Sequence, residues 1–69
     1  MRTFGEILAE KMRARGLSQR KLARVLDVTP MTVSQWVRGV TYPNLLTACD
    51  IADYFGCALD ELVDRKVKL

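Results

Sequence analysis

The chain has 69 residues, of which 49% are hydrophobic and 28% are charged. A chain this short buries only about 60% of the surface of its unfolded form, which is too little for a deep substrate cleft. The composition excludes disorder, and no apolar run could span a membrane or serve as a signal peptide. We expect one cytoplasmic domain over 1–69, with its core at about 3–63 and a basic tail at 65–69.

The residue types needed for metal binding and catalysis are scarce. There is no histidine, and the two cysteines are Cys49 and Cys57. Because a zinc site usually needs four Cys or His ligands, we expect two reduced thiols, no metal and no cofactor. No nucleophile is paired with a base, and no Gly-rich phosphate loop occurs. The sequence therefore predicts that the protein is not an enzyme, and it indicates no small-molecule ligand.

The charge is unevenly distributed along the chain. Residues 1–39 hold eight basic and three acidic side chains, a net +5, whereas 40–69 hold three basic and five acidic ones, a net −2. A basic half joined to an acidic half favours one surface for an anionic polymer and another for a different contact.

Helical periodicity predicts the first helix over about 3–15. Thr3 and Glu6 form a capping-box pattern at its start, and Gly16 ends it in the position that glycine fills at least cost. Its apolar face consists of Phe4, Ile7, Leu8 and Met12.

Two further helices follow with a very short break between them. The second runs over about 18–26 from the cap Ser18, with an apolar stripe of Leu22, Ala23 and Leu26. The third begins at the cap Thr29 and ends near Arg38. Pro30 falls at its first position, where a missing N–H costs no helical bond.

The remainder of the chain predicts two more helices. The fourth covers about 45–55 after the cap Asn44, and its inward residues are Leu45, Ala48, Ala52 and Phe55. A short fifth helix is expected at about 59–64. With no strand pattern, the sequence indicates an all-α fold of five helices joined by short connections.

The second and third helices have the outline of a helix-turn-helix, because only three or four residues join them. Ala23 is small where the two helices must approach closely, and Val28 can fill the turn between them. Val33 and Trp36 share one face of the third helix and can hold it against the core.

The opposite face of the third helix carries Met31, Ser34, Gln35 and Arg38. A short, mostly neutral face on a helix with an apolar back suits the major groove of DNA. The Gln35 amide matches the N6/N7 edge of adenine, and Met31 and the Thr32 methyl can contact thymine methyls. The alternative is a plain solvated face, which the preceding basic helix disfavours.

Residues that flank this face can hold phosphate. Arg38 stands at the end of the third helix. Gln19, Arg20 and Lys21 stand at the start of the second helix, where exposed N–H groups also attract anions.

The run GLSQRKLARVLDVTPMTVSQWVRG (16–39) resembles the helix-turn-helix of the phage repressor and Cro-like family, also called lambda-repressor-like or XRE. YPNLLTACDIADYFGCALDELV (42–63) is similar to that family's last two helices. The resemblance implies a five-helix DNA-binding domain that acts as a dimer on an operator with two-fold symmetry. Together with the exposed face of the third helix, the resemblance implies DNA base contacts by Thr29, Pro30, Met31, Thr32, Ser34 and Gln35. It implies DNA phosphate contacts by Gln19, Arg20, Lys21, Arg38 and Val40.

The chain departs from the family pattern at several positions. Asp27 stands where the family often has glycine. Met12 and Val37 stand where many members pair a buried arginine with an acid, and an apolar pair can replace such an ion pair at little cost. Leu46 stands where many members carry a charge. A candidate dimer interface therefore includes Tyr42, Leu46, Cys57 and Ala58.

The leading interpretation is a sequence-specific transcription regulator, a repressor from a phage or mobile element, associated with the nucleoid when bound to double-stranded DNA. One alternative is an antitoxin that regulates its own operon and binds a toxin. Another is a helical protein-interaction module without DNA binding, which predicts no salt-dependent binding to any duplex.

Overall fold

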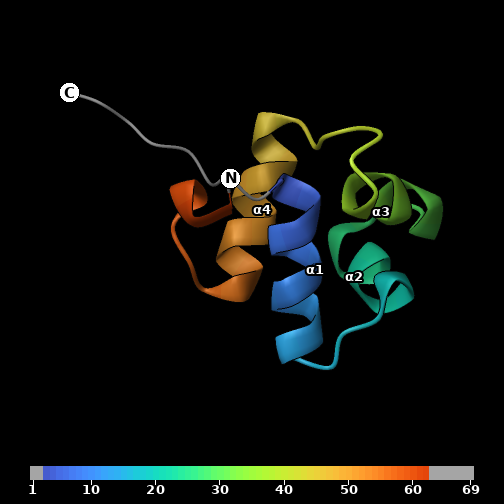
Figure 1. Cartoon of the computed structure of the whole chain (residues 1–69), viewed down its shortest axis with the longest axis horizontal. Helices are drawn as coiled ribbons and strands as arrows, with labels where there is room; N and C mark the ends of the chain where they lie inside the picture. The colour runs from blue at the N-terminus through green and yellow to red at the C-terminus, as the bar shows by residue number, and fades with distance from the viewer. Residues whose placement is uncertain (1–2, 63–69) are drawn as a thin grey trace.

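The computed structural model describes residues 3–62, which form four α-helices and one short 3-10 helix (Figure 1). The elements in chain order are α1 (Phe4–Ala14), α2 (Gln19–Leu26), α3 (Pro30–Val37), α4 (Leu45–Phe55) and η1 (Leu59–Leu62). Strands are absent from this range, so the all-α prediction is confirmed. Within 3–62, no helix is long and apolar enough to cross a bilayer. The predicted basic tail at 65–69 lies outside the described residues.

The fifth element differs from the prediction. The expected α-helix at 59–64 is a 3-10 helix over Leu59–Leu62, and residues 63 and 64 lie outside the described range. Its first turn is closed by the bond from the Glu61 N–H to the Ala58 carbonyl at 3.0 Å, and the Glu61 carboxylate accepts the Ala58 N–H at 2.6 Å. A four-residue segment gains little from the i→i+4 pattern, and short 3-10 turns are the usual alternative.

The α-helices begin at polar caps, as their sequences predict. In α1 the Thr3 hydroxyl accepts the Glu6 N–H at 3.1 Å, and the Glu6 carboxylate accepts the Thr3 N–H at 2.8 Å, which completes the capping box. The side chains of Ser18 and Asn44 each accept the N–H three residues further on. These bonds satisfy amides that have no partner within the helix.

In Figure 1, α1 runs through the middle of the molecule, with α4 on one side and the α2–α3 pair on the other. α2 packs on α3, α1 packs on α3, and η1 packs on both α4 and α1. Leu8, Leu22, Val33 and Ile51 are completely inaccessible to solvent, so every α-helix contributes a side chain to one shared core. The other buried members of this core are Phe4, Met12, Ala23, Trp36, Ala52, Phe55 and Leu62.

The buried face of α4 differs from the predicted one at Leu45 and at Ile51. Leu45, predicted to point inward, is 69% exposed, whereas Ile51, absent from the predicted face, is fully buried. Ala48, Ile51, Ala52 and Phe55 follow the i, i+3, i+4, i+7 spacing of a buried stripe. Leu45 continues that spacing toward the N-terminus of α4, but there α4 extends past the end of α1 (Figure 1).

Gly5 allows α1 to lie directly against the end of α3. A Cβ at this position would lie 2.5 Å from the Trp36 carbonyl oxygen and still closer to the Val37 carbonyl oxygen. Backbone atoms cannot rotate away as a side chain can, so only glycine permits this approach. The sequence pattern did not single out Gly5, because a lone glycine inside a helix carries no periodic signal.

Arg15 joins the end of α1 to the end of α4. Its guanidinium donates to the Tyr54 carbonyl at 3.1 Å and to the Phe55 carbonyl at 3.0 Å. It also lies 5.5 Å and 5.1 Å from the ring centroids of the same two residues. A cation at a helix C-terminus satisfies unpaired carbonyls and is favoured by the helix dipole. Arg15 therefore has a structural partner that its position in a basic run did not indicate.

Candidate nucleic-acid interface

The two helices of the helix-turn-helix meet at Ala23, which is 1% exposed. The turn between them consists of Asp27, Val28 and Thr29. Val28 is half-buried against the core, and its N–H donates to the Ala23 carbonyl at 2.9 Å. The predicted roles of Ala23 and Val28 are therefore confirmed, and the connection holds α3 close across α2.

Asp27 adopts the left-handed conformation, with φ 58° and ψ 46°. It is the one residue other than glycine with positive φ among residues 3–62. Aspartate tolerates this region better than most side chains do. α2 therefore ends in a left-handed residue, although the sequence has no glycine at this position.

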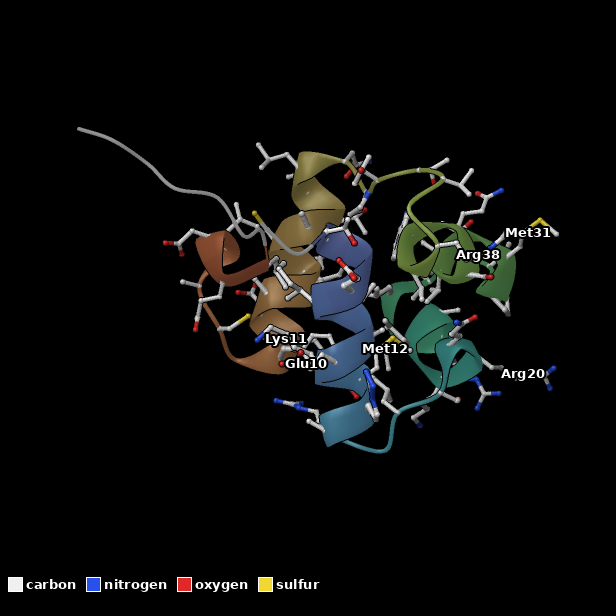
Figure 2. All side chains as sticks on the ribbon, viewed as in Figure 1. Glu10, Lys11, Met12, Arg20, Met31 and Arg38 are labelled. Atoms are coloured by element: carbon white, nitrogen blue, oxygen red, sulfur yellow. The ribbon has the colours of Figure 1, made fainter. Side chains whose placement is uncertain are left out.

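α3 has a buried back and an exposed front. Val33 is fully buried and Trp36 is 3% exposed, which anchors the helix to the core. On the other face, Met31 is 69% exposed, and Ser34 and Gln35 are half-buried. Figure 2 shows Met31 and Arg20 projecting from the α2–α3 side of the molecule, away from α1 and α4. The predicted front of α3 is therefore presented to solvent as one surface.

The first turn of α3 is closed by hydroxyl groups. The Thr29 hydroxyl oxygen accepts the Thr32 N–H at 3.2 Å, and the two threonine hydroxyl oxygens lie 2.8 Å apart. Pro30 follows Thr29 at the first helical position, as predicted. Thr29 and Pro30 are exposed and Thr32 is half-buried.

The end of α3 is tied to the loop that follows it. The Val40 N–H donates to the Gln35 carbonyl at 2.9 Å, and the Gly39 N–H donates to the Trp36 carbonyl at 3.1 Å. Gly39 has φ 77°, the left-handed conformation that permits this closure. Arg38 is exposed at the helix end, where its charge is accessible. The Val40 N–H is already bonded and the side chain is apolar, so Val40 has no unbonded hydrogen-bond donor for the predicted phosphate contact.

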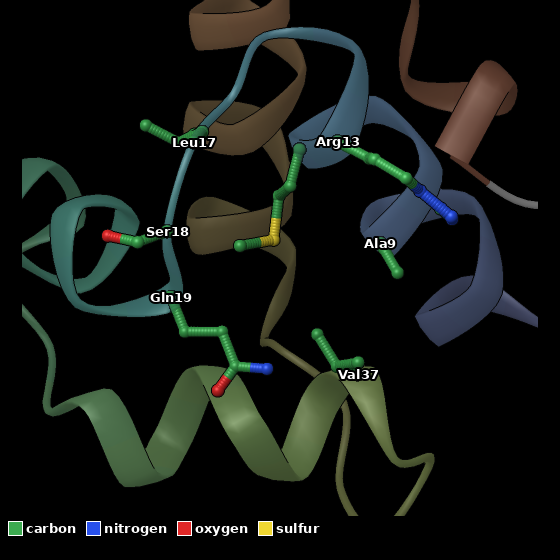
Figure 3. A pocket seen from close by; sticks show the side chains of 7 residues that line it. Ala9, Arg13, Leu17, Ser18, Gln19 and Val37 are labelled. Carbon is green, nitrogen blue, oxygen red and sulfur yellow. The ribbon is translucent and has the colours of Figure 1, made fainter.

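Gln19, Arg20 and Lys21, the residues expected to hold phosphate at the start of α2, are all exposed. Gln19 also lines an open groove of about 440 Å³ beside the ends of α1 and α3. Figure 3 shows the Gln19 amide and the Val37 side chain converging on this groove. The groove is lined by Ala9, Met12, Arg13, Leu17, Ser18, Gln19 and Val37, so the apolar replacements Met12 and Val37 form part of its wall.

The exposed cations of the helix-turn-helix and of the end of α1 are not neutralised locally. They make no ion pair with an acid in the range that the structure describes. Exposed cations without an acidic partner attract a polyanion. The members of this set are Arg13, Arg20, Lys21, Arg24 and Arg38.

The residues expected at a dimer interface lie near the two ends of α4. Tyr42 and Leu46 are exposed by 66% and 78%, whereas Cys57 is half-buried and packs against the core. Ala58 and Cys57 follow the end of α4, and Leu46 stands at its beginning, so the two pairs are separated by the length of the helix, about 16 Å. Tyr42 and Leu46 instead belong with two exposed side chains that the sequence did not group with them. We call Val40, Tyr42, Leu45 and Leu46 the apolar strip.

A family model described as helix-turn-helix matches residues 8–62. The chain therefore belongs to the helix-turn-helix family, in the XRE-type, lambda-repressor-like branch. This membership confirms the resemblance seen in the sequence and assigns the class of helix-turn-helix transcription regulators.

Individual relatives agree with this class. The chain is 35% identical over 66 residues to an uncharacterized HTH-type transcriptional regulator of Rickettsia prowazekii, covering 90% of this chain and 72% of the relative. It is 33% identical over 60 residues to the HTH-type transcriptional activator BcrR of Enterococcus faecalis, covering 87% of this chain but 29% of that protein. The P22 c2 repressor protein, solved with a synthetic operator, shares the fold with a TM-score of 0.86 at 23% identity, over 93% of this chain and 97% of that one.

Proposed function

We propose that the protein is a sequence-specific regulator of transcription that binds double-stranded DNA with α3 in the major groove. The observation that carries this proposal is the exposed face of α3, which is neutral, lies over a buried Val33–Trp36 back and is flanked by unpaired cations. Base edges are read by hydrogen bonds and methyl contacts, whereas phosphates are held by charge.

Base reading in this proposal belongs to the residues from Thr29 to Gln35. Gln35 can donate and accept at the same time, which matches the major-groove edge of adenine. Its backbone is held in place, because the Gln35 carbonyl accepts the Val40 N–H. Met31 is 69% exposed and offers an apolar surface to thymine methyl groups. The half-buried Ser34 lies at the margin of this face.

Phosphate binding belongs to the two ends of the reading surface. Gln19, Arg20 and Lys21 lie at the start of α2, where the Gln19 and Arg20 amides precede the first helical bonds and can also donate to an anion. Arg38 lies beyond the opposite end of α3. Contacts on both sides would hold the neutral face in one register along the duplex.

The proposed mode of action is repression by a dimer on a palindromic operator. The apolar strip supports a dimer, because four large apolar side chains, each at least 59% exposed, occur within seven residues. The strip begins at Val40, two residues beyond Arg38, so a second copy seated there would lie next to DNA. Occupying an operator is sufficient to exclude other proteins from it, and repression therefore needs no further activity.

Selection of bound duplexes from a random library tests this proposal directly. We expect a palindromic site with A·T pairs in each half and half-site centres about 34 Å apart, one turn of the double helix. A single half-site without symmetry would contradict the dimer. No duplex binding that weakens with salt would contradict DNA binding itself and favour the interaction-module alternative.

Two substitutions distinguish base recognition by Gln35 from phosphate binding by Arg38. Gln35→Ala should cost about 1–3 kcal/mol on the selected site and relax the base preference there. Arg38→Ala should weaken binding to all sequences and lower the slope of log K against log salt by about 0.9. Titrations of both variants on selected and random duplexes measure the difference. Equal losses on the two duplexes for Gln35→Ala would contradict its role in base reading.

A further inference from the structure

Thr29 and Thr32 form a hydroxyl pair at the start of α3. Their Oγ1 atoms lie 2.8 Å apart, a hydrogen bond in which either oxygen can be the donor. The Thr29 Oγ1 also accepts the Thr32 N–H at 3.2 Å. Two separate bonds therefore connect the cap residue to Thr32, which is itself on the face proposed to read DNA.

The pair restricts the Thr32 side chain to one orientation. A threonine within a helix commonly turns its hydroxyl toward a backbone carbonyl three or four residues earlier. Here the Thr32 hydroxyl is bonded to the Thr29 hydroxyl instead. Because Oγ1 and the methyl carbon share the same Cβ, fixing one staggered position for the oxygen also fixes the position of the methyl group.

The number of protons limits what the pair can offer to a ligand. Two hydroxyl groups carry two protons, and one of these lies between the two oxygens. A single O–H remains for an outside acceptor, and it belongs to Thr32 when Thr29 donates the shared proton, which is the arrangement that the proposal below requires. The pair therefore presents one hydrogen-bond donor together with the Thr32 methyl group.

We propose that this pair is one reading unit that selects thymine, with Thr29 as the positioning residue and Thr32 as the contact. Thymine exposes in the major groove an acceptor, O4, beside its C5 methyl group. The pair exposes a donor beside a methyl, so a single base satisfies both. This inference rests on the proposed DNA binding and adds a base preference that Gln35 does not supply.

The experiment compares four bases at each thymine of the selected site. Uracil removes the methyl group and keeps O4, whereas 5-methylcytosine opposite guanine keeps the methyl group and replaces the acceptor with an amino donor. For the unmodified protein we expect one thymine per half-site at which either replacement weakens binding about threefold or more. Cytosine, which lacks both features, should bind most weakly there.

Two variants of Thr32 test separately the hydrogen bond to O4 and the contact with the thymine methyl group. Thr32→Val keeps the methyl shape without a hydroxyl, so it should no longer distinguish thymine from 5-methylcytosine at that position. Thr32→Ser keeps the hydroxyl without the methyl, so it should no longer distinguish thymine from uracil. If Thr32→Val retains the full preference for thymine over 5-methylcytosine, the proposal is overturned.

Two variants of Thr29 test the positioning role. Thr29→Val removes the bonded hydroxyl and should reduce both preferences although Thr32 is intact, whereas Thr29→Ser should restore them. A residue that only caps the helix would lower binding to all four duplexes equally and leave their ratios unchanged, which would overturn the positioning role. A selected site without such a thymine would overturn the reading unit alone, and absence of salt-dependent duplex binding would overturn the proposed function as well.

Discussion

α2 and α3 both begin at a hydroxyl cap, but their first turns carry different charges. α2 begins at the hydroxyl of Ser18 and α3 at the hydroxyl of Thr29, and each hydroxyl accepts the N–H three residues on. The first turn of α2 then continues as Gln-Arg-Lys and that of α3 as Pro-Met-Thr. One helix start is strongly basic and the other carries no charge.

The two starts also differ in the amide donors that they leave for a ligand. In α2 the amides of Gln19 and Arg20 precede the first helical bond. In α3 Pro30 has no N–H and the Thr32 N–H is bonded to Thr29, which leaves the amide of Met31. A cap therefore sets where a helix begins, and the residues after it decide whether that end suits phosphate or base edges.

The largest expected effect comes from breaking the contact that holds α3 in place. Gly5→Ala puts a methyl group against the Trp36 and Val37 carbonyls, so α1 and α3 must separate. Overpacking of this kind costs about 3 kcal/mol, and we expect the melting temperature to fall by more than 10 °C. Calorimetry measures this loss, and Gly16→Ala meets no atom within 4 Å but is strained by its φ of 61°. Because Gly5 lies within α1 at an ordinary helical φ, only the α1–α3 contact can destabilise Gly5→Ala, and an unchanged melting temperature would contradict that contact.

The second expected effect concerns the basic start of α2. Arg20→Ala should lower the slope of log K against log salt by about 0.9, because one phosphate contact and its released counterion are lost. Lys11→Ala removes the same charge from α1, on the other side of the molecule (Figure 2), and should leave the slope unchanged. Duplex titrations from low to moderate salt measure both. Equal slopes for Arg20→Ala and the unmodified protein would contradict the phosphate contact.

The smallest expected effect compares the two caps directly. Ser18→Ala and Thr29→Ala should each lower the free energy of unfolding by about 1 kcal/mol, because each removes one capping acceptor. Denaturant titration measures these losses. On DNA the two variants should differ: Thr29→Ala should change the ratio of affinities among sequences, whereas Ser18→Ala should keep that ratio. Identical base preferences in the two variants would mean that the caps are functionally equivalent.

Much of the fold could be predicted because its signals are local. Each cap acts on an amide three residues away, and the four caps are Thr3, Ser18, Thr29 and Asn44. The buried face of α3, which consists of Val33 and Trp36, follows from helical periodicity. Asp27 was indicated by the family resemblance, because glycine often stands at that position, and the structure shows that it is left-handed. The 3-10 form of the last element was missed, because the same short apolar spacing satisfies either kind of helix.

The sequence by itself determined the helix starts, the buried and exposed faces of α3 and the separation of charge along the chain, because all three depend on neighbours within a few residues. Only the tertiary structure decided that Arg15 binds the Tyr54 and Phe55 carbonyls and that Gly5 admits the end of α3. It also decided that Leu45 is exposed and Ile51 is buried. These features join residues that are far apart in the chain or depend on where a helix leaves the core, and no periodic pattern within one segment carries that information.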